Sequence, residues 1–168
     1  MRLFFAIWPP RETAQALHAW AIEAQRLCGG RVMRAETMHL TLAFLGDVEE
    51  ERLPDLTGLA VKADRHLLPI EQARYWRHNR IVWAGPLETP DATMRLVAGL
   101  NENLSEKNFD VEKRAFAAHV TLLREAGKSA ELPPVPAVAW PVEEFLLVCS
   151  QLGPKGPHYE TVARFTLG

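Results

Sequence analysis

The order of apolar and polar residues along the chain predicts strands and helices in alternation. Short apolar runs predict strands over residues 2–8, 31–34, 39–45, 68–76, 80–83, 119–123, 142–150 and 159–167. Apolar residues spaced by three or four positions predict amphipathic helices over 11–27, 49–63 and 90–107. Prolines and glycines end several of these segments, because proline interrupts a helix or a strand ladder and glycine favours helix ends.

The predicted elements form two halves of similar order. Each half has a long helix, then a strand with a His-x-Thr phrase, then a hairpin, and the two histidines lie 80 residues apart (119 − 39). A proline-rich linker at 132–136 and a loop of Gly and Pro at 153–157 flank the last strands. Strands with helices outside them favour the α+β class, with antiparallel or mixed sheets. We expect one domain over 1–168, made of two interleaved lobes related by a pseudo-twofold axis. The lobes contain two antiparallel or mixed sheets with outer helices, and the active cleft lies between them.

The composition is that of an ordinary globular protein, with 48% hydrophobic residues, 24% charged residues and a net charge of −2. Such a chain lacks the broad basic surface that non-specific nucleic-acid binding needs, but recognition of one terminal nucleotide needs no such surface. Cys28 and Cys149 are far apart and unpatterned, which indicates a reducing compartment. The first apolar run is too short for a signal peptide, and no segment approaches the ~18 apolar residues of a membrane span. We expect a cytoplasmic monomer with no membrane partner.

The candidate chemistry lies in two similar phrases, His39-Leu40-Thr41-Leu42 and His119-Val120-Thr121-Leu122. In a strand, residues i and i+2 point to the same face, so each phrase presents an imidazole and a hydroxyl to one ligand. Two such strands brought together surround one small space with two imidazoles and two hydroxyls. That set suits acid–base chemistry on a phosphate ester.

The histidines have two other interpretations. Either histidine alone could be an ordinary core or surface side chain, but two matching phrases make that reading weaker. A zinc site usually combines three or four His, Cys or carboxylate ligands, whereas threonine is a poor zinc ligand and stands at i+2 in both phrases. The other four histidines lack a comparable context and are interpreted as incidental; they are His18, His66, His78 and His158.

The paired phrases resemble those of the two-histidine (2H) phosphoesterases. Together with the N-terminal run 2–7, the run 43–46 after the first phrase and the strand 80–83, they are similar to the RNA 2′,3′-cyclic phosphodiesterase branch, historically named 2′-5′ RNA ligase. The resemblance covers almost the whole chain. It implies a bilobal α+β fold, no metal or nucleotide cofactor, and RNA 3′ ends or nucleotides with a 2′,3′-cyclic phosphate as partners. One departure is that Phe116-Ala117-Ala118 precedes His119 where many relatives have a proline before the histidine.

The residue types suggest how a cyclic phosphate would be opened. Water needs a base to take its proton, and the departing ribose oxygen needs an acid; two imidazoles with ordinary pKa values of ~6.5 can divide these roles near neutral pH. The resemblance assigns His119 as the base and His39 as the acid. Thr41 and Thr121 are expected to donate hydrogen bonds to the non-bridging phosphate oxygens.

The terminal base needs a stacking surface, for which Phe5 and Arg124 are the candidates. Strict alternation puts Arg124 on the face opposite His119, so a strand end or a bulge is required to turn it inward. Core packing is the competing interpretation for Phe5. Three residues in or beside the Gly- and Pro-rich loop are expected to line the entrance: Ser150, Lys155 and Tyr159. The Gly and Pro content of this loop fits a binding loop and equally fits a plain hairpin connection.

The residues leave other functions open. One alternative is another 2H activity, either ATP-independent 2′-5′ joining of RNA ends or opening of the cyclic phosphate of a small nucleotide. A second is a non-catalytic module that binds RNA ends. Intact His and Thr in both phrases favour an enzyme. The sequence leaves the physiological RNA unnamed, and the resemblance suggests a product with a 2′-phosphate.

Overall fold

The computed structural model describes residues 1–127 and 131–168. Its helices are α1 (Arg11–Cys28), α2 (Leu53–Thr57) and α3 (Asp91–Glu106), with 3-10 turns η1 (Ala35–Thr37) and η2 (Glu50–Arg52). Its strands are β1 (Arg2–Ile7), β2 (Arg31–Val32), β3 (Leu40–Asp47), β4 (His66–Ile70), β5 (Gln72–Trp76), β6 (Ile81–Gly85), β7 (Val120–Arg124), β8 (Val138–Val142), β9 (Glu144–Gly153) and β10 (Gly156–Thr166). The α+β class predicted from the sequence is therefore confirmed.

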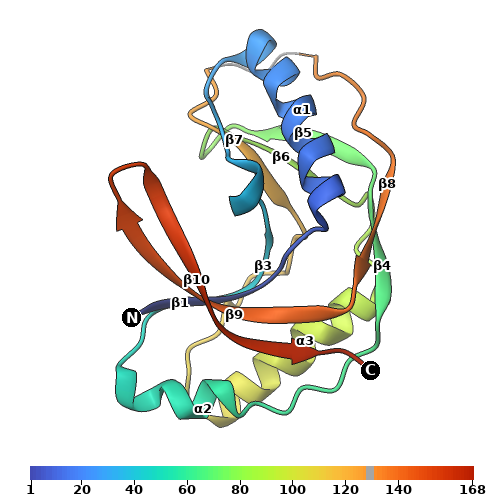
Figure 1. Cartoon of the computed structure of the whole chain (residues 1–168). Coiled ribbons are helices and arrows are strands. Elements are labelled where there is room, and N and C mark those ends of the chain that lie inside the picture. Colours follow the sequence, from blue (N-terminus) through green and yellow to red (C-terminus); the bar gives the residue numbers. More distant parts are fainter. Residues whose placement is uncertain (128–130) are drawn as a thin grey trace.

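One large sheet organises the molecule (Figure 1). Its eight strands run in the order β10-β9-β1-β3-β7-β6-β5, with β2 added beside β7, and β4 and β8 form a separate two-stranded sheet. Every pairing among the described strands is antiparallel, so the mixed alternative is not observed. The helix α1 lies near the β5–β6–β7 end of the sheet, whereas α2 and α3 lie near the other end.

The two strands that carry the His-x-Thr phrases are neighbours in this sheet. They are β3 and β7, and the pairing between them is Leu40 with Val120. This single pair joins the strands of the two halves into one continuous path. Each motif histidine immediately precedes its strand, so the two histidines meet where the two halves of the chain meet.

In each phrase, the residue between the histidine and the threonine and the residue after the threonine are buried. Their burial fixes which way the histidine and the threonine face. Leu40, Leu42, Val120 and Leu122 are all nearly inaccessible and belong to the main core. The amphipathic faces of α1 and α3 pack into that same core, as their buried leucines and alanines show. Packing of these aliphatic side chains gives the free energy that holds the phrases in place, because burial of apolar area dominates folding.

Two predicted elements have different bounds in the structure, and one strand was not predicted. The predicted helix 49–63 is confined to η2 and the short α2, which ends at Thr57. The predicted strand 68–76 is two strands that meet near Glu71, because β4 pairs with β8 while β5 pairs with β6. The strand β8 follows the proline-rich linker and was missed, because it contains Pro141 and so reads as loop.

The hairpin of β9 and β10 is longer than predicted. Its strands extend through Gly153 and Gly156, so that only two residues form the turn in place of a five-residue loop. Gly156 has a positive φ of 105°, a conformation that glycine adopts without steric cost. The hairpin therefore projects from the sheet as a long arm (Figure 1).

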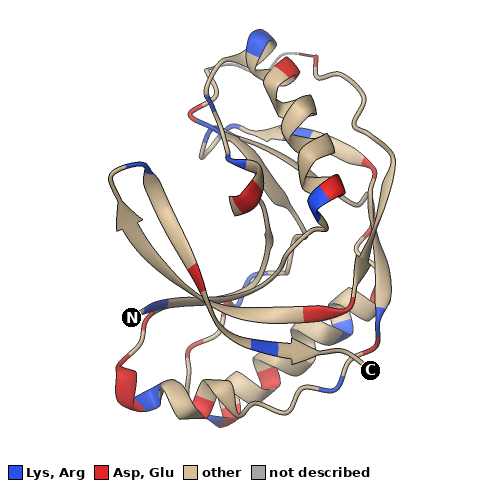
Figure 2. Cartoon of the chain, in the orientation of Figure 1, with Lys and Arg blue, Asp and Glu red and all other residues tan. Residues whose placement is uncertain are grey.

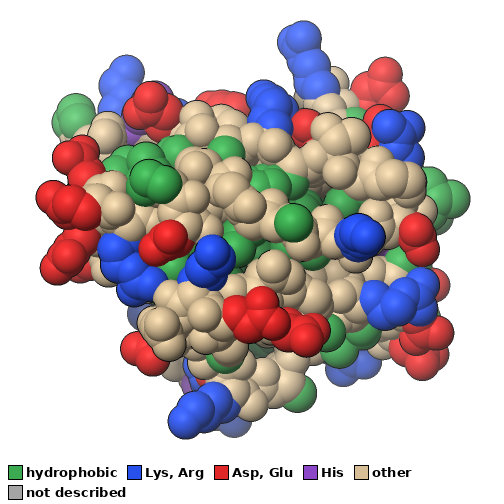
Figure 3. Space-filling view, turned by 90° about the horizontal axis from the view of Figure 1, so that it is seen from below, with side chains coloured by type: hydrophobic (Ala, Val, Ile, Leu, Met, Phe, Trp, Pro, Cys, Tyr) green, Lys and Arg blue, Asp and Glu red, His purple; other side chains and the backbone are tan. Residues whose placement is uncertain are grey.

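Charges are interspersed over the surface. The face seen from below carries acidic and basic side chains side by side, with apolar side chains between them (Figure 3). Both cysteines are buried and free. Over residues 1–127 and 131–168, no helix has the length and apolar character to cross a membrane.

Candidate active site

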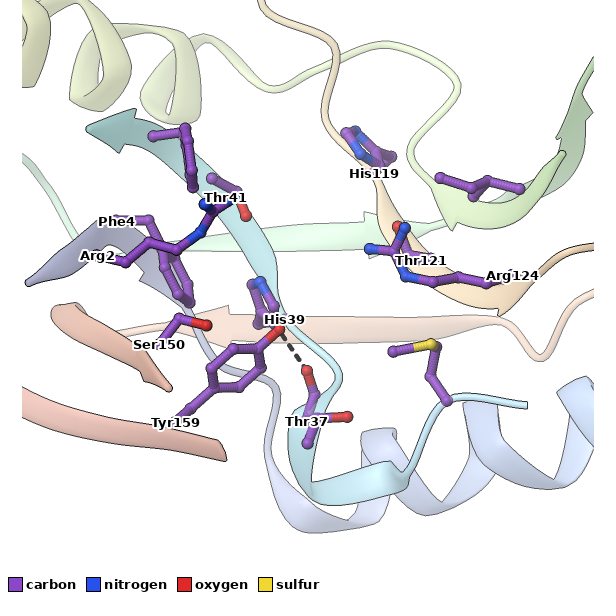
Figure 4. Close-up of a pocket in the computed structure, with 13 residues that line it drawn as sticks. Arg2, Phe4, Thr37, His39, Thr41, His119, Thr121, Arg124, Ser150 and Tyr159 are labelled. Carbon is purple, nitrogen blue, oxygen red and sulfur yellow. Dashed lines mark hydrogen bonds between the residues drawn. The ribbon is translucent and has the colours of Figure 1, made fainter. Parts of the chain in front are cut away.

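A cavity of about 290 Å³ lies where β3 and β7 meet, and it brings most of the predicted site residues together (Figure 4). Seven of the candidates line it: His39, Thr41, His119, Thr121, Arg124, Ser150 and Tyr159. They lie in β3, β7, β9 and β10 or immediately before β3 and β7, so four strands distant in the sequence build one site. Phe5 and Lys155 are the two candidates that do not line it.

The two histidines are anchored in the same way. The Nδ1 atom of His39 lies 2.7 Å from the carbonyl oxygen of Thr37, and that of His119 lies 2.9 Å from the carbonyl oxygen of Ala117. A carbonyl can only accept, so Nδ1 carries a proton in both rings and Nε2 of the neutral ring keeps its lone pair. Each imidazole can therefore take or give a proton through Nε2. The Ala117 anchor also shows that the segment lacking a proline still orients its histidine.

The protonation of both rings departs from the ordinary value that the sequence suggested. Burial lowers the pKa of His39 to about 4, and the positive charges of Arg124 and His119 act in the same direction, against the hydrogen bond to Thr37. Burial also lowers the pKa of His119, again aided by Arg124 and opposed by its backbone hydrogen bond. Both imidazoles are thus neutral at pH 7 before an anion binds. The expectation of unperturbed values is corrected, because it took no account of burial.

Aromatic rings surround His39. The indole of Trp8 stacks on the imidazole with centroids 4.6 Å apart and an interplanar angle of 18°. Phe4 lies 5.0 Å away and Tyr159 meets the imidazole edge-on at 5.3 Å. Trp8 Nε1 donates to the carbonyl oxygen of Glu36 at 3.0 Å, so successive carbonyls of η1, those of Glu36 and Thr37, hold two stacked rings.

His119 has a different aromatic environment. Trp76 contacts it at 4.7 Å and 64°, and Trp83 at 6.3 Å and 75°, both from the β5–β6 hairpin. These are edge contacts, in contrast to the face-to-face contact between His39 and Trp8. The two histidines therefore share their backbone anchor and differ in the rings around them.

Arg124 enters the cavity because of a bulge in β7. Trp83 of β6 pairs with Thr121 and Val82 with Leu123, so Leu122 is an extra residue in β7. Leu122 and Leu123 are both buried, and Arg124 then points to the same side as Thr121. The bulge that the prediction required is present.

The cavity has a positive lining. Arg124 reaches in from β7 and Arg2 from β1, and within the described part of the chain no aspartate or glutamate lines it (Figure 4). Hydroxyl groups of Thr41, Thr121 and Ser150 supply further donors. Since the whole chain has a net charge of −2, this positive, donor-rich space is a local property that suits an anion.

Phe5 is the prediction that the structure contradicts. It is fully buried and packs against Phe145 and Phe165 in the main core, 6.0 and 5.9 Å between centroids. Its neighbour Phe4 faces the cavity instead. Alternation in β1 could start in either phase because residues 3–7 are all buried, so the apolar pattern alone did not choose between the two phenylalanines.

Sequence reasoning missed several residues that line the cavity; they are Arg2, Phe4, Met33, Thr37, Phe44 and Ile81. One signal was available: Arg2 is charged and shares its strand face with Phe4, which favours the phase in which Phe4 faces solvent or ligand. Phe44 is 52% exposed, and the Arg2 guanidinium lies 5.0 Å from the centre of its ring. Lys155 lies at the tip of the β9–β10 hairpin, in a separate cavity.

The donor set of the site bears on metals. Across residues 1–127 and 131–168, no three His, Cys, Asp or Glu side chains gather closely enough to hold a metal ion. The zinc interpretation of the histidines therefore lacks a ligand set among the described residues.

Comparison with known proteins gives consistent matches. The model of the family described as LigT like Phosphoesterase matches residues 7–83. The RNA 2′,3′-cyclic phosphodiesterase of Escherichia coli (strain K12) is 32% identical over 170 residues, covering 99% of this chain and 96% of that protein. The protein of the same name from Thermus thermophilus is 33% identical, covering 99% of this chain and 90% of its own length.

Solved structures match over the same span. The E. coli LigT structure in apo form superposes with a TM-score of 0.90 at 31% identity, covering 99% of this chain and 96% of that one. E. coli LigT complexed with 3′-AMP gives a TM-score of 0.89 at 30% identity, covering 99% and 97%. The likeness thus extends over both halves of the chain and both His-x-Thr strands.

Proposed function

This chain belongs to the LigT-like phosphoesterases of the two-histidine superfamily, within the RNA 2′,3′-cyclic phosphodiesterase branch, and on that basis we propose that it hydrolyses 2′,3′-cyclic phosphate ends of RNA. The proposed product is a phosphomonoester, with the phosphate on the 2′ oxygen. The proposed mechanism is acid–base catalysis by His39 and His119 without a metal ion. The proposal includes the bilobal, pseudo-twofold arrangement, with this cavity as the cleft between the lobes.

The observation that carries the proposal is the matched pair of imidazoles at one cavity. Both donate Nδ1–H to a backbone carbonyl, which leaves both Nε2 atoms for proton transfer. Two arginines and the hydroxyls of Thr41, Thr121 and Ser150 line the same cavity, and such donors suit a phosphate diester. A structural role for the two histidines would need no such common geometry.

In the proposed reaction His119 takes a proton from water, and the water oxygen forms a bond to phosphorus. The bond between phosphorus and the 3′ oxygen breaks, and His39 gives its Nε2 proton to that oxygen. The ring opens to a 2′-phosphate and a 3′-hydroxyl, and a proton passes from His119 to His39 or solvent to restore the starting state. Atoms and charge balance without a co-reactant other than water.

The protonation states must change when substrate binds. In the free protein the proton of a singly protonated pair prefers His119, because the pKa of His39 is the one lowered to about 4. A bound phosphate anion favours imidazolium at both rings. The π face of Trp8 also favours a cation at His39, since an indole face attracts cations. The first effect acts on both rings, whereas the Trp8 contact acts on His39 alone and therefore supports His39 as the acid in the complex.

Thr41, Thr121 and the two arginines act on the phosphate. Their donors lie around the cavity in positions suited to the non-bridging oxygens, where charge grows as the pentavalent state forms. Tyr159 and Phe44 are the proposed contacts of the terminal nucleoside, in place of Phe5. Stacking on such rings tolerates any base.

The test uses adenosine 2′,3′-cyclic phosphate as substrate with EDTA present. Phosphorus NMR of the product distinguishes a 2′-phosphate from a 3′-phosphate, and a 2′-phosphate is expected. Parent protein should turn over, while His39→Ala and His119→Ala should not do so at a comparable rate. Tight binding without turnover by the parent would instead favour the RNA-end binding module.

A further inference from the structure

A second, smaller cavity adjoins the catalytic one. It measures about 140 Å³, and Met33 and Thr37 line both cavities. Three cations line it: Arg31, Arg34 and Lys155. The mechanism proposed above uses none of these three residues, so their gathering beside the site calls for a separate explanation.

The cations come from two parts of the chain. Arg31 belongs to β2 and Arg34 follows it, whereas Lys155 lies in the turn of the β9–β10 hairpin. Figure 2 shows the basic tip of the hairpin and the basic segment around β2 on the same side of the molecule. Arg34 ties the two parts together, because its Nη2 donates to the carbonyl oxygen of Pro157 at 3.0 Å. This bond fixes the guanidinium beside the cavity, although about half of the side chain stays exposed to solvent.

The charge of this cavity is positive and reaches the catalytic one. Among the described residues, no aspartate or glutamate lines it. Glu36 pairs with Arg34 at 3.5 Å, but both side chains are largely exposed, so the pair is weak and leaves a net positive site. Burial raises the pKa of Tyr159, and the charges of Arg124 and Arg34 both oppose that rise, which places Arg34 within electrostatic reach of the catalytic cavity.

We propose that the cavity lined by Arg31, Arg34 and Lys155 binds the phosphate on the 5′ side of the terminal nucleotide. A nucleotide at an RNA end carries one phosphate at its 2′ and 3′ oxygens and another at its 5′ oxygen, so a second anion site is needed one ribose away from the first. The inference rests on the proposed function and adds to it a preference for RNA ends over free nucleoside cyclic phosphates. Arginine and lysine donors suit a phosphate oxygen through charge-assisted hydrogen bonds.

The preference can be measured with two substrates that differ in one phosphate. They are adenosine 2′,3′-cyclic phosphate with a 5′-hydroxyl and the same compound with a 5′-phosphate. The parent protein should show a higher kcat/KM for the 5′-phosphate form, by about tenfold or more. Arg31→Gln, Arg34→Gln and Lys155→Gln should each reduce this ratio by about three- to tenfold, because each removes one cation from a partly exposed site.

The controls separate charge from structure. Lys62→Gln and Arg95→Gln remove a cation from a different cavity and should leave the ratio unchanged. Arg34→Lys keeps the positive charge but can lose the bond to Pro157. This variant should retain most of the preference in kcat/KM for the 5′-phosphate substrate. All these variants should hydrolyse the 5′-hydroxyl substrate at the parent rate, and the ratio should fall in the parent when salt is raised.

Two results would overturn the inference: equal kcat/KM for both substrates in the parent, or an unchanged ratio in the triple Gln variant. Failure of the proposed function is a different result, since neither substrate would then be hydrolysed. A 5′-phosphodiester, tested as a dinucleotide with a cyclic end, should behave like the 5′-phosphate.

Discussion

Leu40 of β3 pairs with Val120 of β7, and both side chains are fully buried. Each of them stands between the histidine and the threonine of its phrase. Because neighbouring residues of a strand point to opposite faces, burying this pair turns both His-x-Thr sets toward the cavity. In an antiparallel register the residues on either side of this pair also lie opposite each other. His39 therefore faces Thr121, and Thr41 faces His119. The hydrophobic contact thereby positions the polar site.

Removing either imidazole should abolish most of the activity. We expect His39→Ala and His119→Ala each to lower kcat/KM by about 10²–10⁴-fold, which is the usual contribution of a positioned acid or base. Both should keep the circular dichroism spectrum of the parent. His18→Ala, on α1 and outside the cavity, is the matched control and should be fully active. Near-parental activity of either site variant contradicts the two-histidine mechanism.

The pH dependence should be bell-shaped and differ between free enzyme and complex. Catalysis needs one neutral and one protonated ring, and burial lowers the pKa of both rings, that of His39 to about 4. The optimum of kcat/KM, which reports the free enzyme, should therefore lie below pH 6.5. The bound phosphate raises both values, so the limbs of kcat should lie about one to three pH units higher.

The same profiles test the roles of the two rings. With His119 as base, its alanine variant should lose the acidic limb of the residual activity, and His39→Ala should lose the basic limb. The limbs are apparent values of the pair. A flat profile between pH 4 and 9 in the parent would rule out the paired mechanism, and exchanged limbs would reverse the roles.

Trp8 should control the acid form of His39. Trp8→Leu removes the π face stacked on the imidazole, so we expect kcat to fall about tenfold and its basic limb to move to lower pH. Trp8→Phe keeps a ring face but loses the bond to Glu36, and should lower kcat with little movement of the limb. The control is Trp20→Phe, which also loses an indole bond to a backbone carbonyl, far from the site. It should change stability alone.

Phe5 and Phe44 should separate stability from binding. Phe5→Leu creates space in the core and should destabilise the protein by about 1–3 kcal/mol in urea unfolding, with unchanged kinetics in the folded protein. Phe44→Leu removes a half-exposed ring and should raise KM several-fold at nearly unchanged stability. If Phe5→Leu changes KM while Phe44→Leu does not, the nucleoside contacts proposed here are wrong.

Chelation should leave the activity intact. No described cluster of side chains offers three metal ligands, and the imidazoles are held for proton transfer through Nε2. We expect equal initial rates before and after dialysis against EDTA, with a zinc-dependent phosphodiesterase as a positive control for the treatment. A loss of rate that one added metal restores would contradict the acid–base mechanism.

The features predicted best from the sequence are those that depend on the regular spacing of apolar residues. The helices α1 and α3 and the strands β3 and β7 follow directly from their apolar spacing, and so does the shared face of His and Thr, which depends only on the strand period of two. Four central residues of the site could therefore be named before the structure: His39, Thr41, His119 and Thr121.

The remaining features depend on contacts between distant segments. The phase of β1 was ambiguous because both of its faces are buried, which led to Phe5 instead of Phe4. The lowered pKa values arise from burial by rings of β1 and β10 that approach His39 only in the folded chain. Likewise, no local pattern around Glu71 signals that β4 and β5 belong to different sheets.

The extra residue at Leu122 has a consequence for how such a site can vary between generations. A change of side chain at that position alters packing, whereas the bulge turns the guanidinium of Arg124 to the side of Thr121. Loss of one codon between Thr121 and Arg124 would remove the bulge and leave one residue between them, so strict alternation would still keep both side chains on the cavity side. Flattening the strand at its present length would instead direct Arg124 toward the core. A relative could therefore lose this residue without losing the orientation of its arginine, provided that the bulge and the residue disappear together.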